Sequence, residues 1–328
     1  MNQVLNWLLE PDTPSARYLA LRHLGRAEDD DQVVAARAAI VTSAPARAIL
    51  DAQYPAGYWI KPDRGYSPRY KATIWQLIFL ADLGATRTAA IARACEHVLA
   101  HALHAGCGLF SAHVHSTGIY PCLNGNLLRA LRHFGYGGHP TVRLVTESLA
   151  RRVAADGFTC PRNSTRARDR ATWQPCVWGC VKVLRGLAVV PDKERSPAVR
   201  MAVERGTAFL LARDLARDQR PGLAETGSHW LRFGFPLGYD SDLLEALLAL
   251  AELGVKGKLD DAVRIVRAKQ DGAGRWRLER TLPRTWADLG TTGQPNKWVT
   301  LRALQVLEAV ELSTYSTTFP QTGCGTCG

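Results

Sequence analysis

Five apolar segments recur along the chain, and each predicts a helix that is buried on several sides. They carry hydrophobic residues on most faces, as a helix in the middle of a bundle does. Gly84, Gly135 and Gly254 stand where the end of such a helix needs a left-handed residue. The segments cover residues 72–85, 122–137, 176–190, 241–255 and 296–310, and residues 15–25 form a shorter first copy.

A second class of segments alternates with the first and carries charge along one face. This pattern is typical of surface helices that are apolar inward and polar outward. Pro140 and Pro197 lie near first-turn positions, which tolerate proline. We expect outer helices at 32–52, 87–104, 140–154, 197–213 and 259–269, with residues 2–9 as a candidate sixth.

The alternation predicts an all-α fold of about six helical hairpins. The copies start about 50 to 65 residues apart, whereas HEAT-like repeats take roughly 40–47. The inner helices are too apolar to line an open groove, so we favour an α/α toroid, an inner barrel ringed by outer helices, over an open solenoid. No strands are expected, because runs of alternating β-branched residues are absent. One domain is expected over residues 1–312, followed by a flexible tail over 313–328.

The composition indicates a globular protein, with 46% hydrophobic and 22% charged residues among 328. No apolar run reaches the roughly 18 residues of a membrane helix. The first residues lack the basic start of a secretory signal, so we expect a cytoplasmic protein. Eight cysteines then point to metal ligation, catalysis or apolar packing rather than to disulfides.

The net charge is +11, and arginine is much commoner than lysine. The basic residues are spread over many helices instead of being clustered, which argues against nucleic acid as a partner. Guanidinium groups match the oxygens of phosphates, so an anionic small molecule remains possible beside a simply solvated surface.

Two turns share the pattern Gln, three residues, Gly, one residue, Trp. They are QYPAGYW, from Gln53 to Trp59, and QDGAGRW, from Gln270 to Trp276, and residues 105–110 and 155–160 are degraded copies. The pattern resembles the Gln-Trp (squalene cyclase) repeat of the terpenoid cyclase and protein prenyltransferase superfamily. There the Gln caps a helix end and the Trp stacks across the turn. The resemblance covers residues 14 to 311 and implies a toroid with a central cavity.

In this superfamily the cavity is lined by the N-terminal halves of the inner helices. The resemblance places there Tyr70, Lys71, Trp75, Asn126, Trp178, Tyr239, Lys297 and Trp298. Cyclases use aromatic rings to stabilise carbocations, although core packing explains tryptophans equally well. Prenyltransferases bind diphosphate with basic residues at the cavity mouth, for which this chain offers Arg69, Lys71, Lys297 and Arg302.

The cysteines give the sharpest chemical hypothesis. Cys122 and Cys176 each open an inner helix, Cys160 lies in the turn before the second, and His113 and His115 precede the first. Three thiolates and an imidazole form a tetrahedral zinc site, for which we expect Cys122, Cys160, Cys176 and His115. Prenyltransferases hold zinc at a similar location with a different ligand set. Alternatively, the cysteines are small buried apolar residues.

Two acidic residues, Asp240 and Asp242, open another inner helix in the sequence YDSDLL. Class II terpene cyclases protonate their substrate with an Asp-x-Asp-Asp motif, but here the fourth residue is Leu243 and the motif is incomplete. Of the two, Asp242 is the preferred general acid. The alternative is that both carboxylates cap the helix.

Two functions remain open at this point. One is an enzyme that cyclises or transfers an isoprenoid or another apolar substrate in the central cavity. The other is a non-catalytic toroid that binds a small molecule or a protein partner, with structural zinc or no metal. Prenyltransferases need a second subunit, so a partner subunit is possible. Cys324 and Cys327 suggest a metal or redox role for the tail, although a flexible glycine-rich end is the simpler interpretation.

Overall fold

The computed structural model describes residues 2–155, 157–166, 168–217, 229–255, 257 and 259–317. Within these residues the chain is mostly helical, with thirteen α-helices and five short strands in two small sheets. The helical class expected from the sequence is confirmed. The helices are α1 (Asn2–Leu8), α2 (Pro14–His23), α3 (Asp31–Ile40), α4 (Ala44–Leu50), α5 (Thr73–Asp82), α6 (Ala89–His101), α7 (Pro121–His133), α8 (Pro140–Ala150), α9 (Val177–Ala188), α10 (Pro197–Leu211), α11 (Leu243–Glu252), α12 (Asp260–Ala268) and α13 (Lys297–Thr317).

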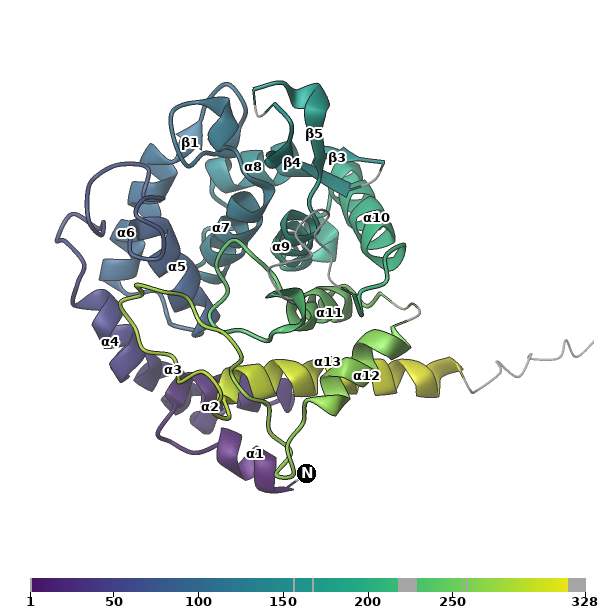
Figure 1. Cartoon of the computed structure of the whole chain (residues 1–328). Helices are drawn as coiled ribbons and strands as arrows, with labels where there is room; N and C mark the ends of the chain where they lie inside the picture. The colour runs from purple at the N-terminus through teal and green to yellow at the C-terminus, as the bar shows by residue number, and fades with distance from the viewer. Residues whose placement is uncertain are drawn as a thin grey trace, which may run out of the picture.

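Two sets of helices differ in burial. The segments expected as inner helices are α2, α5, α7, α9, α11 and α13. Figure 1 shows α7, α9 and α11 towards the middle of the molecule and α6, α8 and α10 at its periphery. Helix α5 buries eight of its ten residues, whereas α12 buries three of nine. The inner helices therefore supply most of the core, as their nearly continuous apolar sequence requires.

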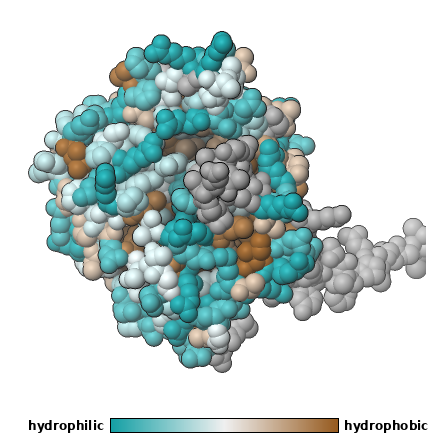
Figure 2. All heavy atoms as spheres, in the orientation of Figure 1, coloured by the Kyte–Doolittle hydropathy of each residue, from teal (hydrophilic) through white to brown (hydrophobic). Residues whose placement is uncertain are grey.

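From α5 onwards, the helices expected as inner pack against one another in chain order. Helix α7 contacts α5 and α9, α11 contacts α9 and α13, and α13 contacts α2. Each of α6, α8, α10 and α12 packs against an inner helix next to it in the chain. The face seen in Figure 2 is mainly hydrophilic, as expected where outer helices turn their charged sides to water.

Most helix boundaries agree with the sequence pattern, with two differences. The expected helix 32–52 is divided into α3 and α4, because Ser43 and Pro45 begin a new helix at its middle. Helix α13 continues to Thr317 and so enters the expected tail. The rest of the tail, with Cys324 and Cys327, lies outside the described residues. Gly84, Gly135 and Gly254 have φ of 78°, 84° and 64°, which confirms them as left-handed helix ends.

The expectation of no strands is wrong. The strands are β1 (Leu103–His104), β2 (Leu109–Phe110), β3 (Val153–Ala154), β4 (Gly157–Ser164) and β5 (Trp173–Pro175). All pairings are antiparallel, β1 with β2, and β4 between β3 and β5. The hairpins β1–β2 and β3–β4 fall on the two degraded Gln-Trp copies. Most of these strands are too short to produce an alternating pattern in the sequence.

The two complete Gln-Trp turns make the same pair of hydrogen bonds. The Trp59 indole N–H donates to the Ile49 carbonyl oxygen at 2.7 Å, and its backbone N–H to Thr73 Oγ1 at 3.1 Å. Trp276 repeats both bonds, to the Val266 carbonyl at 2.7 Å and to Thr300 Oγ1 at 2.9 Å. Each tryptophan thus ties the end of an outer helix, α4 or α12, to the inner helix that follows.

The glycine of the first turn is required by packing. Gly57 has a φ of 91°, and a Cβ there would lie 2.7 Å from the backbone of Arg93 in α6. The Gln53 side chain donates to the Ala90 carbonyl at 3.0 Å and so holds the turn to the start of α6. In the degraded copy, the Phe110 N–H donates to Asn124 Oδ1 of α7 at 2.8 Å, in place of the Trp-to-Thr bond.

Helices α7 and α9 approach each other backbone to backbone. A Cβ on Gly125 would lie 2.2 Å from the Lys182 carbonyl oxygen, and one on Gly186 would lie 2.6 Å from the Gly125 oxygen. Only glycine fits at either position, since no backbone can move aside. This contact holds α7 and α9 side by side, so that their N-terminal ends, which carry Cys122 and Cys176, are neighbours.

None of the described helices is by itself long and apolar enough to cross a membrane; only the bent pair α3 and α4 together has the length and composition.

Candidate functional site

A pocket of about 430 Å³ lies at the N-terminal ends of four inner helices. We call it the thiol pocket, because Cys122, Cys160 and Cys176 all line it. The loop before α5, the starts of α7 and α9, the loop before α11 and the strand β4 contribute to its wall. The remaining lining residues are Tyr66, Arg69, Tyr120, Arg162, Asn163, Pro175, Val177, Trp178, Arg213 and Tyr239.

The three cysteines are separate in sequence, and the fold brings them together. Cys176 is the N-cap of α9, and its Sγ accepts the Gly179 N–H at 3.3 Å. The Cys160 side chain hydrogen-bonds to Cys176, and this bond, together with burial, raises the pKa of Cys160. Burial, and the nearby Cys176 sulfur, raise the pKa of Cys122 to about 12. Cys122 and Cys160 are therefore neutral thiols at physiological pH.

The expected zinc ligands are not assembled as a set. His115 does not line the thiol pocket, and its ring packs against His113 with 5.9 Å between centroids. Among the described residues, no three or more His, Cys, Asp or Glu side chains form a group that could hold a metal ion. The site residues thus do not fit a tetrahedral zinc ion in this arrangement, and zinc stays a prediction.

Aromatic rings form much of the pocket wall. Tyr66 and Tyr120 lie 5.9 Å apart between centroids, and Trp178 and Tyr239 lie 6.1 Å apart. Two of the expected cavity residues, Trp178 and Tyr239, therefore line the pocket. Tyr70 and Trp75 lie behind this wall.

Behind the wall, Tyr70 stacks on Tyr239 at 6.5 Å, and its ring also meets Trp75 edge-on at 5.1 Å. The Trp75 indole donates to the Tyr66 carbonyl at 2.8 Å. These two expected cavity residues therefore support lining residues without lining the pocket themselves.

The charged lining residues are all basic. The Arg69 guanidinium lies 4.8 Å from the Tyr239 ring and hydrogen-bonds to Tyr66. Arg162 is exposed at the pocket rim. No Asp or Glu lines the pocket in the described part of the chain, and neither Arg69 nor Arg162 makes an ion pair there. The pocket therefore offers positive charge beside apolar and aromatic surface.

The other expected cavity residues lie elsewhere. Asn126 and Trp298 line a second cavity, further along the inner helices. The Lys71 ammonium lies 4.2 Å from the centre of the Trp286 ring. Lys297 forms ion pairs with Glu10 at 3.0 Å and Asp12 at 2.5 Å.

Both candidate acids have structural partners: one accepts hydrogen bonds from the backbone, and the other forms an ion pair. Asp242 is the N-cap of α11, with Oδ1 accepting the Glu245 N–H at 2.8 Å and Oδ2 the Gly234 N–H at 2.9 Å. Burial raises the pKa of this carboxyl. Asp240 is paired with Arg280. Neither acid is among the described residues that line the thiol pocket or the second cavity, so capping accounts for Asp242, and its role as a general acid stays a prediction.

Sequence reasoning missed Tyr66, Tyr120 and Arg162. A usable signal was present for the tyrosines, because both precede an inner helix, as Tyr239 also does. No such signal exists for Arg162, which reaches the pocket from β4, a strand that the pattern did not predict.

No family model matches the chain, and no curated protein matches it. Ten chains of known structure match; one is described as a protein from Actinoplanes. It has 17% sequence identity, the match covers 84% of this chain and 99% of that one, and the TM-score is 0.32.

Proposed function

We propose that the helices form an α/α toroid with a closed inner ring. In its support, α13 contacts both α11 and α2, so the last inner helix returns to the first. Between α2 and the end of α5, the Tyr18 ring lies so close to Gly84 that an added Cβ would be 2.8 Å away. The matching bonds of Trp59 and Trp276 also fit a ring of repeated hairpins.

We infer that this protein binds, in the thiol pocket, a small molecule with an apolar or aromatic body and an anionic group. The observation that carries this inference is the lining, which combines aromatic rings and arginines with no described carboxylate. Aromatic faces bind apolar groups, and guanidinium groups bind carboxylates and phosphates. The volume of about 430 Å³ lies in the range of small-molecule sites, roughly 300–1,000 Å³.

A short prenyl diphosphate is the ligand class that unites this chemistry with the superfamily resemblance. Its hydrocarbon chain would lie against Tyr66, Tyr120 and Trp178, and its diphosphate against Arg69 and Arg162. Arg69 is already positioned by its contacts with Tyr66 and Tyr239, so little side-chain entropy is lost when it binds an anion.

Calorimetric titration of the purified chain tests this proposal. Geranyl diphosphate is the ligand, and geraniol and inorganic diphosphate supply its two halves. We expect the whole ligand to bind more tightly than either half. Arg69→Gln is expected to weaken binding about tenfold through loss of a charge-assisted contact.

The matched control is Arg200→Gln, which removes the same charge from an exposed residue of α10 outside the pocket. Equal affinity for geraniol and geranyl diphosphate would remove the anionic part of the proposal. Absence of binding by all three compounds would contradict it entirely.

A second candidate is a transferase in which the Cys176 thiolate attacks the first carbon of the bound prenyl diphosphate, so that a C–S bond forms while the C–O bond breaks and diphosphate leaves with its electron pair. Its favouring observation is that this sulfur accepts the Gly179 N–H at the start of α9 and also hydrogen-bonds to Cys160. Hydrogen bonds accepted by a sulfur favour its nucleophilic thiolate form. We expect iodoacetamide to alkylate Cys176 before Cys122, as read by mass spectrometry of peptides. Faster reaction of Cys122 would exclude this role.

A further inference from the structure

A second cavity, of about 540 Å³, is lined by residues from all six inner helices. It lies along the C-terminal halves of α2, α5, α7 and α9, and it includes parts of α11 and α13. We call it the charged cavity, because five arginines and three acidic residues line it. It shares no described lining residue with the thiol pocket.

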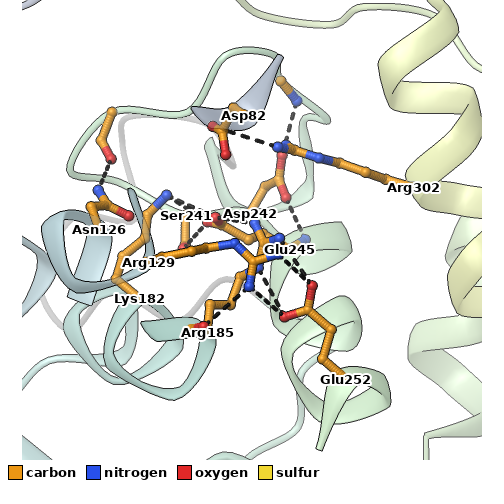
Figure 3. A network of polar contacts seen from close by, with 12 residues as sticks. Asp82, Asn126, Arg129, Lys182, Arg185, Ser241, Asp242, Glu245, Glu252 and Arg302 are labelled. Atoms are coloured by element: carbon orange, nitrogen blue, oxygen red, sulfur yellow. Dashed lines mark hydrogen bonds and ion pairs between the residues drawn. The ribbon is translucent and has the colours of Figure 1, made fainter. Parts of the chain in front are cut away.

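Four of the five arginines have close carboxylate partners. Arg129 forms a two-pronged pair with Glu252, at 3.1 and 2.9 Å. Arg185 reaches Glu252 at 3.2 Å and Glu245 at 3.1 Å (Figure 3). At the margin, Arg22 and Arg132 are each paired at 3.0 Å with glutamates that are not lining residues.

Arg302 is the exception. Its closest described carboxylate is Asp82, at 3.7 Å between Nη2 and Oδ2, which is too long for a hydrogen bond (Figure 3). Nη1 is buried and has no hydrogen-bond partner among the described residues. The side chain is 10% exposed, and its guanidinium lies over the Phe235 ring at 4.8 Å.

The buried guanidinium of Arg302 therefore lacks part of the hydrogen bonding and counter-charge that it would have in water. Buried donors without acceptors lose their hydration and regain nothing for it. His133, another lining residue, adds no charge at neutral pH, because burial lowers its pKa. An oxyanion in the cavity would supply the acceptors that Arg302 lacks, and guanidinium groups bind such groups through two hydrogen bonds.

We propose that the charged cavity binds a small anion through a carboxylate or phosphate group held against Arg302. This site is independent of the ligand proposed for the thiol pocket. The paired arginines Arg129 and Arg185 would surround the anion with positive potential while keeping their own partners. The cavity volume leaves room for a small organic body beside the anionic group.

Thermal unfolding of the full chain at constant ionic strength tests the proposal. The probes are inorganic phosphate and acetate, with chloride as the reference salt. We expect at least one probe to raise the Tm by about 3 °C at saturating concentration, since a ligand that binds only the folded state stabilises it. A larger effect of phosphate or of acetate identifies which oxyanion the site prefers.

Two substitutions should change anion binding in opposite directions. Arg302→Gln is expected to abolish the Tm shift. Asp82→Asn removes the carboxylate that competes for Arg302, so we expect it to tighten anion binding about tenfold. Loss of structure alone cannot produce this gain, so Asp82→Asn remains informative if Arg302→Gln does not fold.

The matched controls are Arg200→Gln and Asp192→Asn, both at exposed residues outside the cavity, and they should respond to anions as the wild type does. Equal shifts in all five proteins would indicate an adventitious ion only and overturn the proposal. No shift in the wild type, or weaker binding in Asp82→Asn, would overturn it as well.

Discussion

The two ends of the inner helices are built differently. At their N-terminal ends, the thiol pocket takes its wall from loops, first turns and strand β4, and its residues are aromatic rings, thiols and arginines. Towards the other end, the charged cavity is lined largely by residues within helices, and Arg129 and Arg185 pair with glutamates of α11. Lys182 of α9 binds Glu245 of α11 at 2.7 Å, and Arg129 of α7 binds Glu252 of α11 at 2.9 Å.

The difference separates groups that hold the fold from groups that face a ligand. A buried charge that loses its partner is strongly destabilising, so the charged pairs fix how α7, α9 and α11 lie against each other. The thiol pocket has no comparable network of ion pairs within the described residues. Substitutions in the charged cavity should therefore affect stability far more than substitutions in the thiol pocket.

The largest loss of stability is expected for Glu245→Gln. Glu245 is 3% exposed and accepts hydrogen bonds from both Lys182 and Arg185. The substitution leaves the buried ammonium of Lys182 without a counter-charge, which should lower the free energy of unfolding by about 3–5 kcal/mol. Urea unfolding at pH 7 measures this loss.

The control for this substitution is Asp51→Asn, which breaks the ion pair with Arg47, where both side chains are exposed. We expect it to cost at most about 1 kcal/mol. Similar losses in the two variants would contradict the view that burial makes the Glu245 network important.

A slightly smaller loss of stability is expected for Gly125→Ala, which acts on the thiol pocket and on the charged cavity at once. The added Cβ would overlap the Lys182 carbonyl at 2.2 Å, so α7 and α9 must separate. We expect a loss of about 3 kcal/mol, the upper range for overpacking. Gly272→Ala is the matched control, because nothing lies within 4 Å of its Cβ. A near-neutral Gly125→Ala would show that this close contact is not needed.

The charged cavity also predicts how stability depends on pH. Burial alone would raise the pKa of the Glu245 carboxyl. The charges of Lys182 and Arg185 outweigh this effect and lower the pKa from 4.5 to about 2. A folded-state pKa below the unfolded value adds stability that is complete above about pH 4.5 and is lost as pH falls towards 2. The shift corresponds to about 3 kcal/mol.

Unfolding free energies measured from pH 5 to pH 2 test this dependence. The wild type should lose stability across this range, and Glu245→Gln should lose less, because it lacks the titrating group. Identical slopes in the two proteins would show that other carboxylates account for acid sensitivity.

The sequence predicted the helices well because their apolar faces repeat over whole turns. It also located the end of the inner helices where the thiol pocket lies, and it placed Cys122, Cys160, Cys176, Trp178 and Tyr239 there. Except for Cys160, which lies on β4, these residues stand at or just before helix starts, which hydrophobic periodicity and helix-end signals identify. The strands were missed because the degraded turns at 105–110 and 155–160 carry no periodic signal.

The sequence placed Asn126, Trp298 and Arg302 in a cavity, but the ion pairs around the charged cavity were missed for a different reason. Lys182, Arg185 and Glu245 lie on helices that are otherwise apolar, and a sequence does not show which charged residues will face each other. Their presence in buried helices was itself a signal, because such charges need a partner. Gly125 and Gly186, within α7 and α9, were likewise a signal of close backbone packing.

The smallest effect on stability is expected at the thiol pocket, where two substitutions of Cys176 can be compared. Cys176 caps α9 by accepting the Gly179 N–H. Cys176→Ala removes this acceptor and should cost about 1 kcal/mol, whereas Cys176→Ser keeps a cap that helices prefer and should leave stability unchanged or slightly higher. Urea unfolding of both variants beside Glu245→Gln measures the contrast between the two ends. A loss in Cys176→Ser as large as in Glu245→Gln would mean that the thiol pocket, too, holds the fold together.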